Sequence, residues 1–372
     1  METILKNMEK ELFVTARWDK NDIRKTWSGT GYALLEGLSK MFCVQKVSLV
    51  NTWWYCTMQI ARRLGLSFLS KPLENIQTSM LQKEVHLHKN IPVFMITGVF
   101  EVDNPSYLYM DNIWKVASFL KSSEAKERKY FNHFFSYSNA EISYQIKRQY
   151  QVFVHSKAIF LMGNWLAEYM KEVYPEFSNK IYAIGGGCNA YSAKGTTGRT
   201  GNKILFVGKA FQRKGGDLVV EAFHLLRKKY RQDAELIIVG PSDKPECCQG
   251  EGIIFKGPVS FEEVGILMQS CDVFCMPSRF EAYGLVFAEA LINGLPCIGR
   301  NAFEMPYFIE RGVTGDLIDD DDAAILAQKM ADVLGNEAMK QRVISKRKEY
   351  ENYYNWDRVC FDIANVIKEN EQ

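Results

Sequence analysis

The second half of the chain alternates short apolar runs with amphipathic patterns, and this alternation limits the fold more than any other feature. The runs at 203–207, 234–239, 252–255, 271–276 and 296–299 are short enough to be buried strands. Between them apolar residues recur at helical spacing, as in Val219, Ala222, Phe223 and Leu226. Strands that alternate with helices favour βαβ units and therefore a parallel sheet with helices on both faces.

The first half carries a similar but less regular pattern. Strands are expected at 12–17, 46–50, 92–97, 158–162 and 181–184, with a helix over 32–40. Residues 189–202 are small, polar and rich in glycine, a composition typical of a linker. Because 372 residues suffice for two domains, we predict one over 1–190 and one over 203–350, followed by a C-terminal helix over 351–372.

Charge is distributed unevenly between the two halves. Residues 1–190 carry 23 basic and 17 acidic side chains, a net charge of +6, whereas 191–372 carry 23 and 27, a net charge of −4. This difference indicates two surfaces with different partners, although random scatter of solvated charge explains it equally well. The total of +2 argues against a nucleic-acid-binding protein, which usually contains a strongly basic domain.

Cysteine usage and the absence of targeting patterns point to the cytoplasm. The nine cysteines do not form a C-x2-C pair with a second pair downstream, so reduced thiols are expected and a metal site is not. The N-terminus has acidic residues and lacks the apolar core of a signal peptide. No window reaches about 18 apolar residues, so no spanning segment is predicted. The acidic run 319–322 is expected to be a solvated helix N-terminus.

The segment 277–290 contains the clearest chemical signal. A strand ends before it and a helix begins near Gly284, whose N-terminus favours a phosphate. Glu281 precedes this helix and Glu289 lies within it. Because two carboxylates would repel a phosphate, we expect them to hold hydroxyl groups, as a sugar and a ribose present. An ordinary solvated pair of glutamates is the simpler alternative.

A second segment, 206–216, follows a predicted strand and precedes a helix. It contains Gly208, Lys209, Arg213, Lys214 and a Gly-Gly pair. Cations at this position can neutralise a diphosphate and stabilise it as a leaving group. Lys214 is the best single candidate, while any one of these cations could equally be solvated on a surface loop.

Taken together, the order and spacing of these motifs resemble the bacterial retaining glycosyltransferases of family 4. The resemblance covers about a third of the chain, roughly 203–318, and Asn355-Trp356-Asp357 resembles the closing segment of that family. The motifs that carry it are Gly208-Lys209, Lys214-Gly215, Val239-Gly240, Lys256-Gly-Pro-Val-Ser260, Glu281 with Glu289, Asn293-Gly-Leu-Pro296 and Gly312-Val-Thr-Gly315.

This resemblance implies the GT-B fold: two Rossmann-like α/β domains with a central cleft and a C-terminal helix that crosses back to the first domain. It implies that Lys209 and Lys214 bind the diphosphate of a nucleotide-sugar donor, with Lys209 standing where arginine is more common. It further implies these contacts with the donor: sugar hydroxyls at Glu281, ribose hydroxyls at Glu289, the base beside Val259, and further donor contacts at Tyr283, Gly284 and Leu285.

The same resemblance implies weaker assignments in the first domain. Gly29, Thr30 and Gly31 match a glycine loop that faces the donor phosphates, and a simple strand-to-helix turn explains them equally well. Asp111 matches only loosely the region that places a catalytic side chain near the reacting sugar, and a solvated loop aspartate is the alternative. We therefore assign catalytic roles to Lys214 and Glu281 in the second domain and to Asp111 in the first.

Aromatic and basic residues at 51–55 and 62–64 suit a helix resting on anionic lipid, with core packing as the alternative. We therefore predict a metal-independent retaining glycosyltransferase that takes a UDP- or GDP-sugar and a glycan or lipid-linked acceptor, without nucleic acid and without a cofactor. We place it in the cytoplasm or at the cytoplasmic face of a membrane. Two alternatives stay open: a nucleotide-sugar epimerase on the same fold, and a non-catalytic partner of an active glycosyltransferase.

Overall fold

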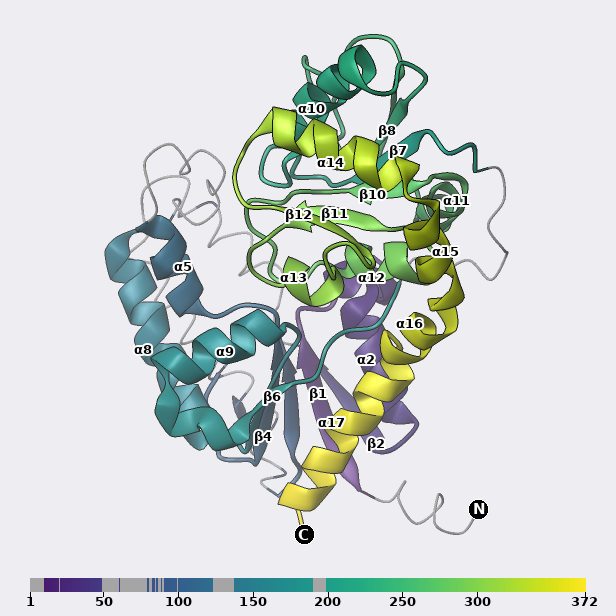
Figure 1. Cartoon of the computed structure of the whole chain (residues 1–372). Coiled ribbons are helices and arrows are strands. Elements are labelled where there is room, and N and C mark those ends of the chain that lie inside the picture. The colour runs from purple at the N-terminus through teal and green to yellow at the C-terminus, as the bar shows by residue number, and fades with distance from the viewer. Residues whose placement is uncertain are drawn as a thin grey trace. The chain divides into compact units, whose positions relative to one another are not determined.

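The computed structural model describes residues 10–19, 21–48, 93–98, 100–122, 137–189 and 199–372, together with 60, 79, 82, 83, 85, 88 and 90–92. The chain divides into two compact units. The first unit consists of Met1–Ser123, His133–Gly185 and Trp356–Gln372, and the second of Glu124–Asn132 and Gly186–Asn355. Each unit contains one parallel sheet and is described by itself (Figure 1).

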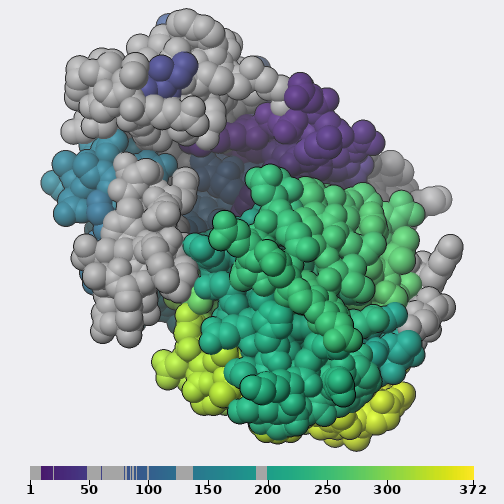
Figure 2. Space-filling model, turned by 90° about the horizontal axis from the view of Figure 1, so that it is seen from above, coloured from purple at the N-terminus to yellow at the C-terminus, as the bar shows by residue number. Residues whose placement is uncertain are grey.

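The sheet of the second unit has six strands in the order β12-β11-β10-β7-β8-β9. All neighbouring strands are parallel, as the alternation of strands and helices predicts. Figure 2 shows this unit, in teal and green, as a close-packed body. The strands are β7 (Lys203–Val207), β8 (Glu235–Val239), β9 (Ile253–Gly257), β10 (Val273–Cys275), β11 (Cys297–Arg300) and β12 (Gly315–Ile318).

Helices cover both faces of this sheet. On one face α10 (Gly216–Lys229) packs against α14 (Ala323–Gly335), and on the other α12 (Leu285–Ile292) contacts α11 (Phe261–Ser270) and α13 (Met305–Phe308) (Figure 1). Two further helices, α15 (Glu337–Ser345) and α16 (Arg347–Tyr353), complete the unit. The inner strands of this sheet therefore lie buried between helical layers, whereas the edge strand β9 alternates half-buried and exposed residues before its buried last residue.

The strand order reverses in the middle of this sheet. From β7 the chain continues to β8 and β9 on one side and then returns to place β10 on the other side of β7. The two central strands are in register, with Val273 opposite Ile204 and Phe274 opposite Leu205. Loops that leave the carboxyl ends of β7 and β10 are therefore neighbours, at the point where doubly wound sheets bind ligands.

The first unit repeats this plan with six parallel strands in the order β2-β1-β3-β4-β5-β6. Its reversal lies between β1 and β3, and strands β3, β4 and β5 are buried along their whole length. The strands are β1 (Glu11–Ala16), β2 (Cys43–Ser48), β3 (Val93–Ile96), β4 (Ser106–Met110), β5 (Ala158–Leu161) and β6 (Ile181–Ala183).

The C-terminal helix α17 (Trp356–Asn370) belongs to the first unit, where it packs against α2 (Thr30–Ser39). Gly37 lets the two helices approach closely, because a Cβ there would lie 2.4 Å from Cys360 Sγ. Lys40 pairs with Asp357 at 2.6 Å, and the Tyr107 hydroxyl donates to Glu371 at 2.6 Å. The other helices in the described part of this unit are η2 (Ile23–Gly29), α5 (Trp114–Lys121), α8 (Asn139–His155), α9 (Asn164–Val173) and η5 (Pro175–Lys180).

The predicted α/β class with two Rossmann-like sheets is confirmed, and ten strands coincide with the predicted ones to within three residues. Strands β4 and β12 were not predicted. Segments 51–55 and 62–64, which suggested contact with lipid, and most of the linker 189–202 lie outside the described residues. In the part of the chain that is described, no helix has the length and apolar character to cross a membrane.

Candidate functional site

Two loops meet at the reversal point of the second sheet. The lysine loop (208–215) joins β7 to α10, and the glutamate loop (277–284) joins β10 to α12. Backbone and side-chain hydrogen bonds hold the loops together: Arg279 N donates to Arg213 O at 2.9 Å, and Ser278 Oγ donates to the same carbonyl at 3.3 Å. The two motifs singled out from the sequence are therefore one structural site.

Lys214 and Glu281 form the centre of this site. The Lys214 ammonium lies 3.0 Å from Glu281 Oε2, and the two side chains are only 16% and 11% exposed. The stem of Lys214 crosses Gly208, where a Cβ would lie 2.4 Å from Lys214 Cδ. A charge pair so largely withdrawn from water keeps both groups in fixed positions, one cation and one carboxylate side by side.

Glycines begin both helices that follow the loops. Gly215 is the N-cap of α10 with φ 76°, and a Cβ there would meet Pro277 O at 2.5 Å. Gly284 is the N-cap of α12 with φ 99°, and a Cβ there would lie 3.0 Å from Glu281 Cγ. Both conformations are left-handed and favour glycine. The positive N-terminus of α12 is thus brought next to the Lys214–Glu281 pair.

Tyr283 and Glu289 accept hydrogen bonds from the segment through which the chain enters the second unit. The Tyr283 hydroxyl accepts a hydrogen bond from Gly186 N at 3.0 Å, and Glu289 Oε1 accepts one from Asn189 N at 3.3 Å. Glu289 is buried within α12, at 6% exposure. The alternative of an ordinary solvated glutamate pair is therefore wrong for both Glu281 and Glu289.

The cations of the lysine loop play different roles. Arg213, expected alongside the two lysines as a cation for a diphosphate, instead donates to the carbonyl of Phe280. The Lys209 side chain is exposed and makes no hydrogen bond or ion pair with any described residue. Lys214 therefore has a fixed position, Lys209 is available to a ligand from solvent, and Arg213 supports the glutamate loop.

A network of ion pairs connects the glutamate loop, through Arg279, to Asp217 in α10 and to Asp321 before α14. The Arg279 side chain is 8% exposed and binds Asp217 at 2.7 Å and Asp321 at 2.7 Å. Arg300 also pairs with Asp321 and donates to Ser278 O at 3.2 Å. Sequence reasoning missed this network, because no spacing rule connects Arg279 to partners 62 and 42 residues away.

The acidic run 319–322 was expected to be a solvated helix N-terminus, and all four residues are exposed directly before α14. Asp322 caps α14 by accepting from Ala324 N at 2.8 Å and Ile325 N at 3.0 Å. Asp321 belongs to the arginine network, and Asp319 pairs with Arg311 at 2.9 Å. Among the residues that the structure describes, no group of three or more potential ligands is placed to hold a metal ion.

The other predicted donor contacts of the second unit lie near its carboxyl edge. Val259 is half-buried in the loop between β9 and α11, and Leu285 is the first residue of α12. The structure therefore joins Gly208, Lys214, Glu281, Tyr283, Gly284, Leu285 and Glu289 along the lysine and glutamate loops and α12.

The predicted residues of the first unit occupy its own carboxyl edge. Asp111 directly follows β4, and Gly29 is the N-cap of α2 with φ 96°. The chain between β1 and α2 is more elaborate than a simple turn, because Trp27 and Ser28 also have positive φ angles of 48° and 56°. The roles of Gly29, Thr30, Gly31 and Asp111 stay predictions.

Comparison with known proteins shows what the second unit is similar to. Residues 189–350 match the model described as glycosyl transferases group 1. A phosphatidyl-myo-inositol mannosyltransferase of Mycobacterium leprae is 28% identical over 177 residues, 46% of this chain and 47% of that protein. A D-inositol 3-phosphate glycosyltransferase of Corynebacterium efficiens is 25% identical over 45% of this chain and 42% of its own length. The match thus spans less than half of these curated relatives.

Solved structures resemble the chain over nearly its full length. Sucrose-phosphate synthase from Thermosynechococcus elongatus superposes with a TM-score of 0.70 at 14% identity, covering 97% of this chain and 99% of that one. WaaG, a glycosyltransferase involved in lipopolysaccharide biosynthesis, gives a TM-score of 0.63 at 14% identity, covering 96% and 99%. These likenesses confirm the GT-B fold class.

Proposed function

We propose that the chain, whose residues 189–350 match the model described as glycosyl transferases group 1, transfers a sugar from a nucleoside diphosphate sugar to an acceptor hydroxyl with retention of anomeric configuration. The observation that carries this proposal is the Lys214–Glu281 pair at 3.0 Å, at the reversal point of the second sheet. Sheets of this kind bind nucleotides at that point.

The pair suits the covalent structure of the donor. In a nucleotide sugar the diphosphate is bonded directly to the anomeric carbon, so a group for phosphate and a group for sugar hydroxyls must stand next to each other. Lys214 supplies the cation and Glu281 the hydrogen-bond acceptor, both held in place before a donor arrives. Such preorganisation lowers the cost of stabilising charge that develops as the bond breaks.

The leaving group is a diphosphate, and this chain offers it three positive elements. Lys214 is fixed, Lys209 is exposed at the start of the same loop, and the N-terminus of α12 begins at Gly284. Together they can stabilise the departing charge without a metal ion. Retention then requires the acceptor to attack from the face that the diphosphate leaves, with a leaving-group oxygen accepting the proton of the acceptor hydroxyl.

The proposal includes the remaining donor contacts that the resemblance implies. Glu289 holds the ribose hydroxyls, Val259 lies beside the base, and Leu285 N–H contacts the diphosphate or the sugar. Glu289 is buried and its Oε1 is held by Asn189 N, so the carboxylate has a fixed position within α12. Gly29, Thr30, Gly31 and Asp111 complete the proposal as contacts contributed by the first unit.

We propose a glycan or a lipid-linked saccharide as the acceptor, in the synthesis of a cell-surface polysaccharide, lipopolysaccharide or glycolipid. The net charge of +6 over residues 1–190 supports peripheral contact with an anionic membrane at its cytoplasmic face. The name of one similar protein, a phosphatidyl-myo-inositol mannosyltransferase, refers to a lipid acceptor. Sedimentation with anionic vesicles should show binding that falls as salt rises, and equal binding to neutral vesicles would contradict it.

A donor screen tests the proposed activity. UDP-, GDP- and dTDP-sugars are added singly, and a true donor should raise the midpoint of thermal unfolding. The selected donor is then incubated with candidate saccharide acceptors, and NMR of the product should show the anomeric configuration of the donor. An epimerised nucleotide sugar would instead identify an epimerase, and stable binding without turnover would identify a non-catalytic partner.

The matched variants for that screen are K214A and K228A. Lys228 is exposed on the same helix that follows Lys214, so its removal changes the charge equally without touching the site. We expect K214A to abolish transfer and K228A to leave it unchanged. Full transfer by a folded K214A protein would overturn the assignment of Lys214.

A further inference from the structure

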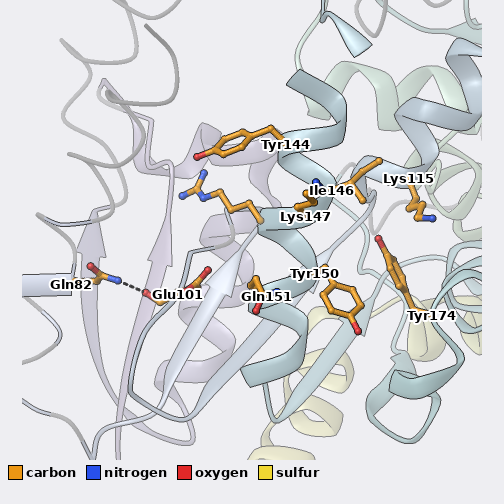
Figure 3. A pocket seen from close by; sticks show the side chains of 10 residues that line it. Gln82, Glu101, Lys115, Tyr144, Ile146, Lys147, Tyr150, Gln151 and Tyr174 are labelled. Atoms are coloured by element: carbon orange, nitrogen blue, oxygen red, sulfur yellow. Dashed lines mark hydrogen bonds between the residues drawn. The ribbon is translucent and has the colours of Figure 1, made fainter. Parts of the chain in front are cut away.

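A hollow of about 740 Å³ surrounds part of helix α8 in the first unit (Figure 3). We call it the α8 hollow. Its size is typical of a small-molecule site. The lining contains three cations against one carboxylate, three tyrosines, two amides and an isoleucine: Lys115, Lys147, Arg148, Glu101, Tyr144, Tyr150, Tyr174, Gln82, Gln151 and Ile146. None of them belongs to the second unit or to the site around Lys214.

One lining group has no partner although it is buried. Tyr174 is 5% exposed, and its hydroxyl makes no hydrogen bond with any of the described residues. Its ring packs against the rings of Tyr150 and Phe153, each with a centroid separation of 5.8 Å. Burial raises the pKa of Tyr174 to about 12, so the hydroxyl carries its proton at neutral pH and acts as a donor. A buried donor without an acceptor is rare in folded proteins, because it has lost water without replacement.

A cation lies over the Tyr174 ring and has no acceptor among the described residues. Lys115 Nζ lies 5.5 Å from the centroid of the Tyr174 ring and forms no ion pair with any described residue. In Figure 3 the Lys115 ammonium and the Tyr174 hydroxyl lie on the same side of α8. One oxygen-rich anionic group placed there would accept hydrogen bonds from both.

The rest of the lining defines what carries that anionic group. Tyrosine rings offer flat apolar surfaces with a polar edge, and amide side chains offer both donors and acceptors. Glu101 lines the hollow, and Glu176 accepts a hydrogen bond from Tyr150, so carboxylates stand among the cations. This mixture of rings, amides and charges suits a saccharide with several hydroxyls and a single anionic group.

We propose that the α8 hollow binds an anionic saccharide, whose carboxylate or phosphate accepts hydrogen bonds from Lys115 and Tyr174. The site needs neither Lys214 nor the nucleotide donor. It therefore goes beyond the proposed transfer reaction and can be tested separately from it.

Titration calorimetry on the full-length protein provides the test. The probes are an oligosaccharide containing glucuronic acid, a sugar phosphate, and a neutral oligosaccharide of matched length. We expect one or both anionic probes to bind and the neutral one to bind at least about tenfold more weakly, as the loss of one charged hydrogen bond implies. Binding of only the carboxylate probe or only the phosphate probe then identifies the charged group.

Three variants assign the contacts. K115A should weaken binding about tenfold, whereas K171A, which removes an exposed lysine from the neighbouring helix α9, should not change it. K214A should bind the anionic probe like the wild-type protein. Loss of binding in K214A would place the probe in the donor site and overturn the proposal.

Tyr174→Phe gives the sharpest discrimination, because it removes only the unpartnered hydroxyl. We expect Y174F to weaken binding several-fold while the midpoint of thermal unfolding of the ligand-free protein stays equal or rises. A lower midpoint with unchanged affinity would show that the hydroxyl has a structural partner such as a buried water, and would overturn the proposal. Failure of both anionic probes to bind at millimolar concentration would overturn it as well.

Discussion

Arg279 and Asp217 form a two-pronged ion pair that ties the glutamate loop to the first turn of α10. Arg279 Nη1 lies 2.7 Å from Asp217 Oδ1, and Nη2 lies 3.1 Å from Oδ2. Asp217 stands three residues after Lys214, and Arg279 stands two residues before Glu281. The Arg279–Asp217 pair therefore helps to fix the backbone next to Lys214 and next to Glu281. Neither residue belongs to the proposed donor contacts.

Replacing Arg279 should lower transfer more than it lowers stability. R279K keeps the charge but cannot make the two parallel hydrogen bonds that arginine makes with Asp217. The position of the glutamate loop relative to the lysine loop is then no longer fixed. We expect a reduced kcat with a midpoint of thermal unfolding close to that of the wild type, whereas R279A should cost about 2 kcal/mol of stability. Arg311→Ala serves as the control, because its pair with Asp319 is exposed and contributes little. Equal kcat values for R279K and the wild type would contradict this positioning role.

Gly215 and Gly312 form a matched pair for measuring the contact between the two loops. Their φ angles are 76° and 74°, but a Cβ at Gly215 would lie 2.5 Å from Pro277 O, whereas a Cβ at Gly312 meets nothing within 4 Å. G312A should therefore cost about 1 kcal/mol from backbone strain alone. G215A should cost more and should also lower transfer, because Pro277 must move. Denaturant unfolding of both variants measures the difference, and equal losses would refute the contact.

We predict that Asp321 stabilises the folded protein at neutral pH and that this stabilisation is lost in strongly acidic solution. Burial raises its pKa, but hydrogen bonds and charge interactions with Arg279 and Arg300 outweigh this effect, and the net pKa lies below its ordinary value of 3.8. The stabilisation is thus fully present above that ordinary value and is lost as the pH falls through the lowered pKa. D321N should flatten the decline of the unfolding midpoint between neutral and strongly acidic pH. An unchanged slope would show that Asp321 does not contribute.

Because α2 and α17 are in close contact at Gly37, adding one methyl group there should lower stability. Gly37→Ala would place a Cβ 2.4 Å from Cys360 Sγ and push the C-terminal helix away from the first unit. We expect a loss of about 1–3 kcal/mol, as for other overpacked sites. Gly335→Ala, with nothing within 4 Å of the added Cβ, should be neutral or stabilising. Denaturant unfolding compares the two, and a G37A protein as stable as G335A would contradict the close packing.

Much of the fold could be predicted because buried parallel strands leave a strong local signal. Strand β7 and helix α12 appear in the sequence as an apolar run and a largely apolar stretch that begins after a glycine. Strand β4 has no such signal, since its core residues include Tyr107 and Tyr109, whose hydroxyls make the segment look polar. Their partners, Glu371 and Gly185 O, lie 264 and 76 residues away. Strand β12 begins with Gly315 and Asp316, which are rare in strands.

The site could be predicted only to the level of its separate loops. Lys214 and Glu281 stood out individually, but the sequence could not show that their charged groups lie 3.0 Å apart. Arg213 and Lys214 look equivalent as neighbouring cations, yet one binds a backbone carbonyl and the other a carboxylate. Such distinctions depend on which loops meet, and that is decided by strand order in the sheet.

Calorimetric titration of UDP and GDP into the wild-type protein, K214A and K228A measures whether the Lys214–Glu281 site holds a nucleoside diphosphate. We predict that the wild type and K228A bind one of the two nucleotides with the same affinity, and that K214A binds it at least about tenfold more weakly, as expected when a charged hydrogen bond to the diphosphate is lost. Equal affinity of K214A and the wild type, or no binding of either nucleotide to the wild type, would contradict the assignment of this site.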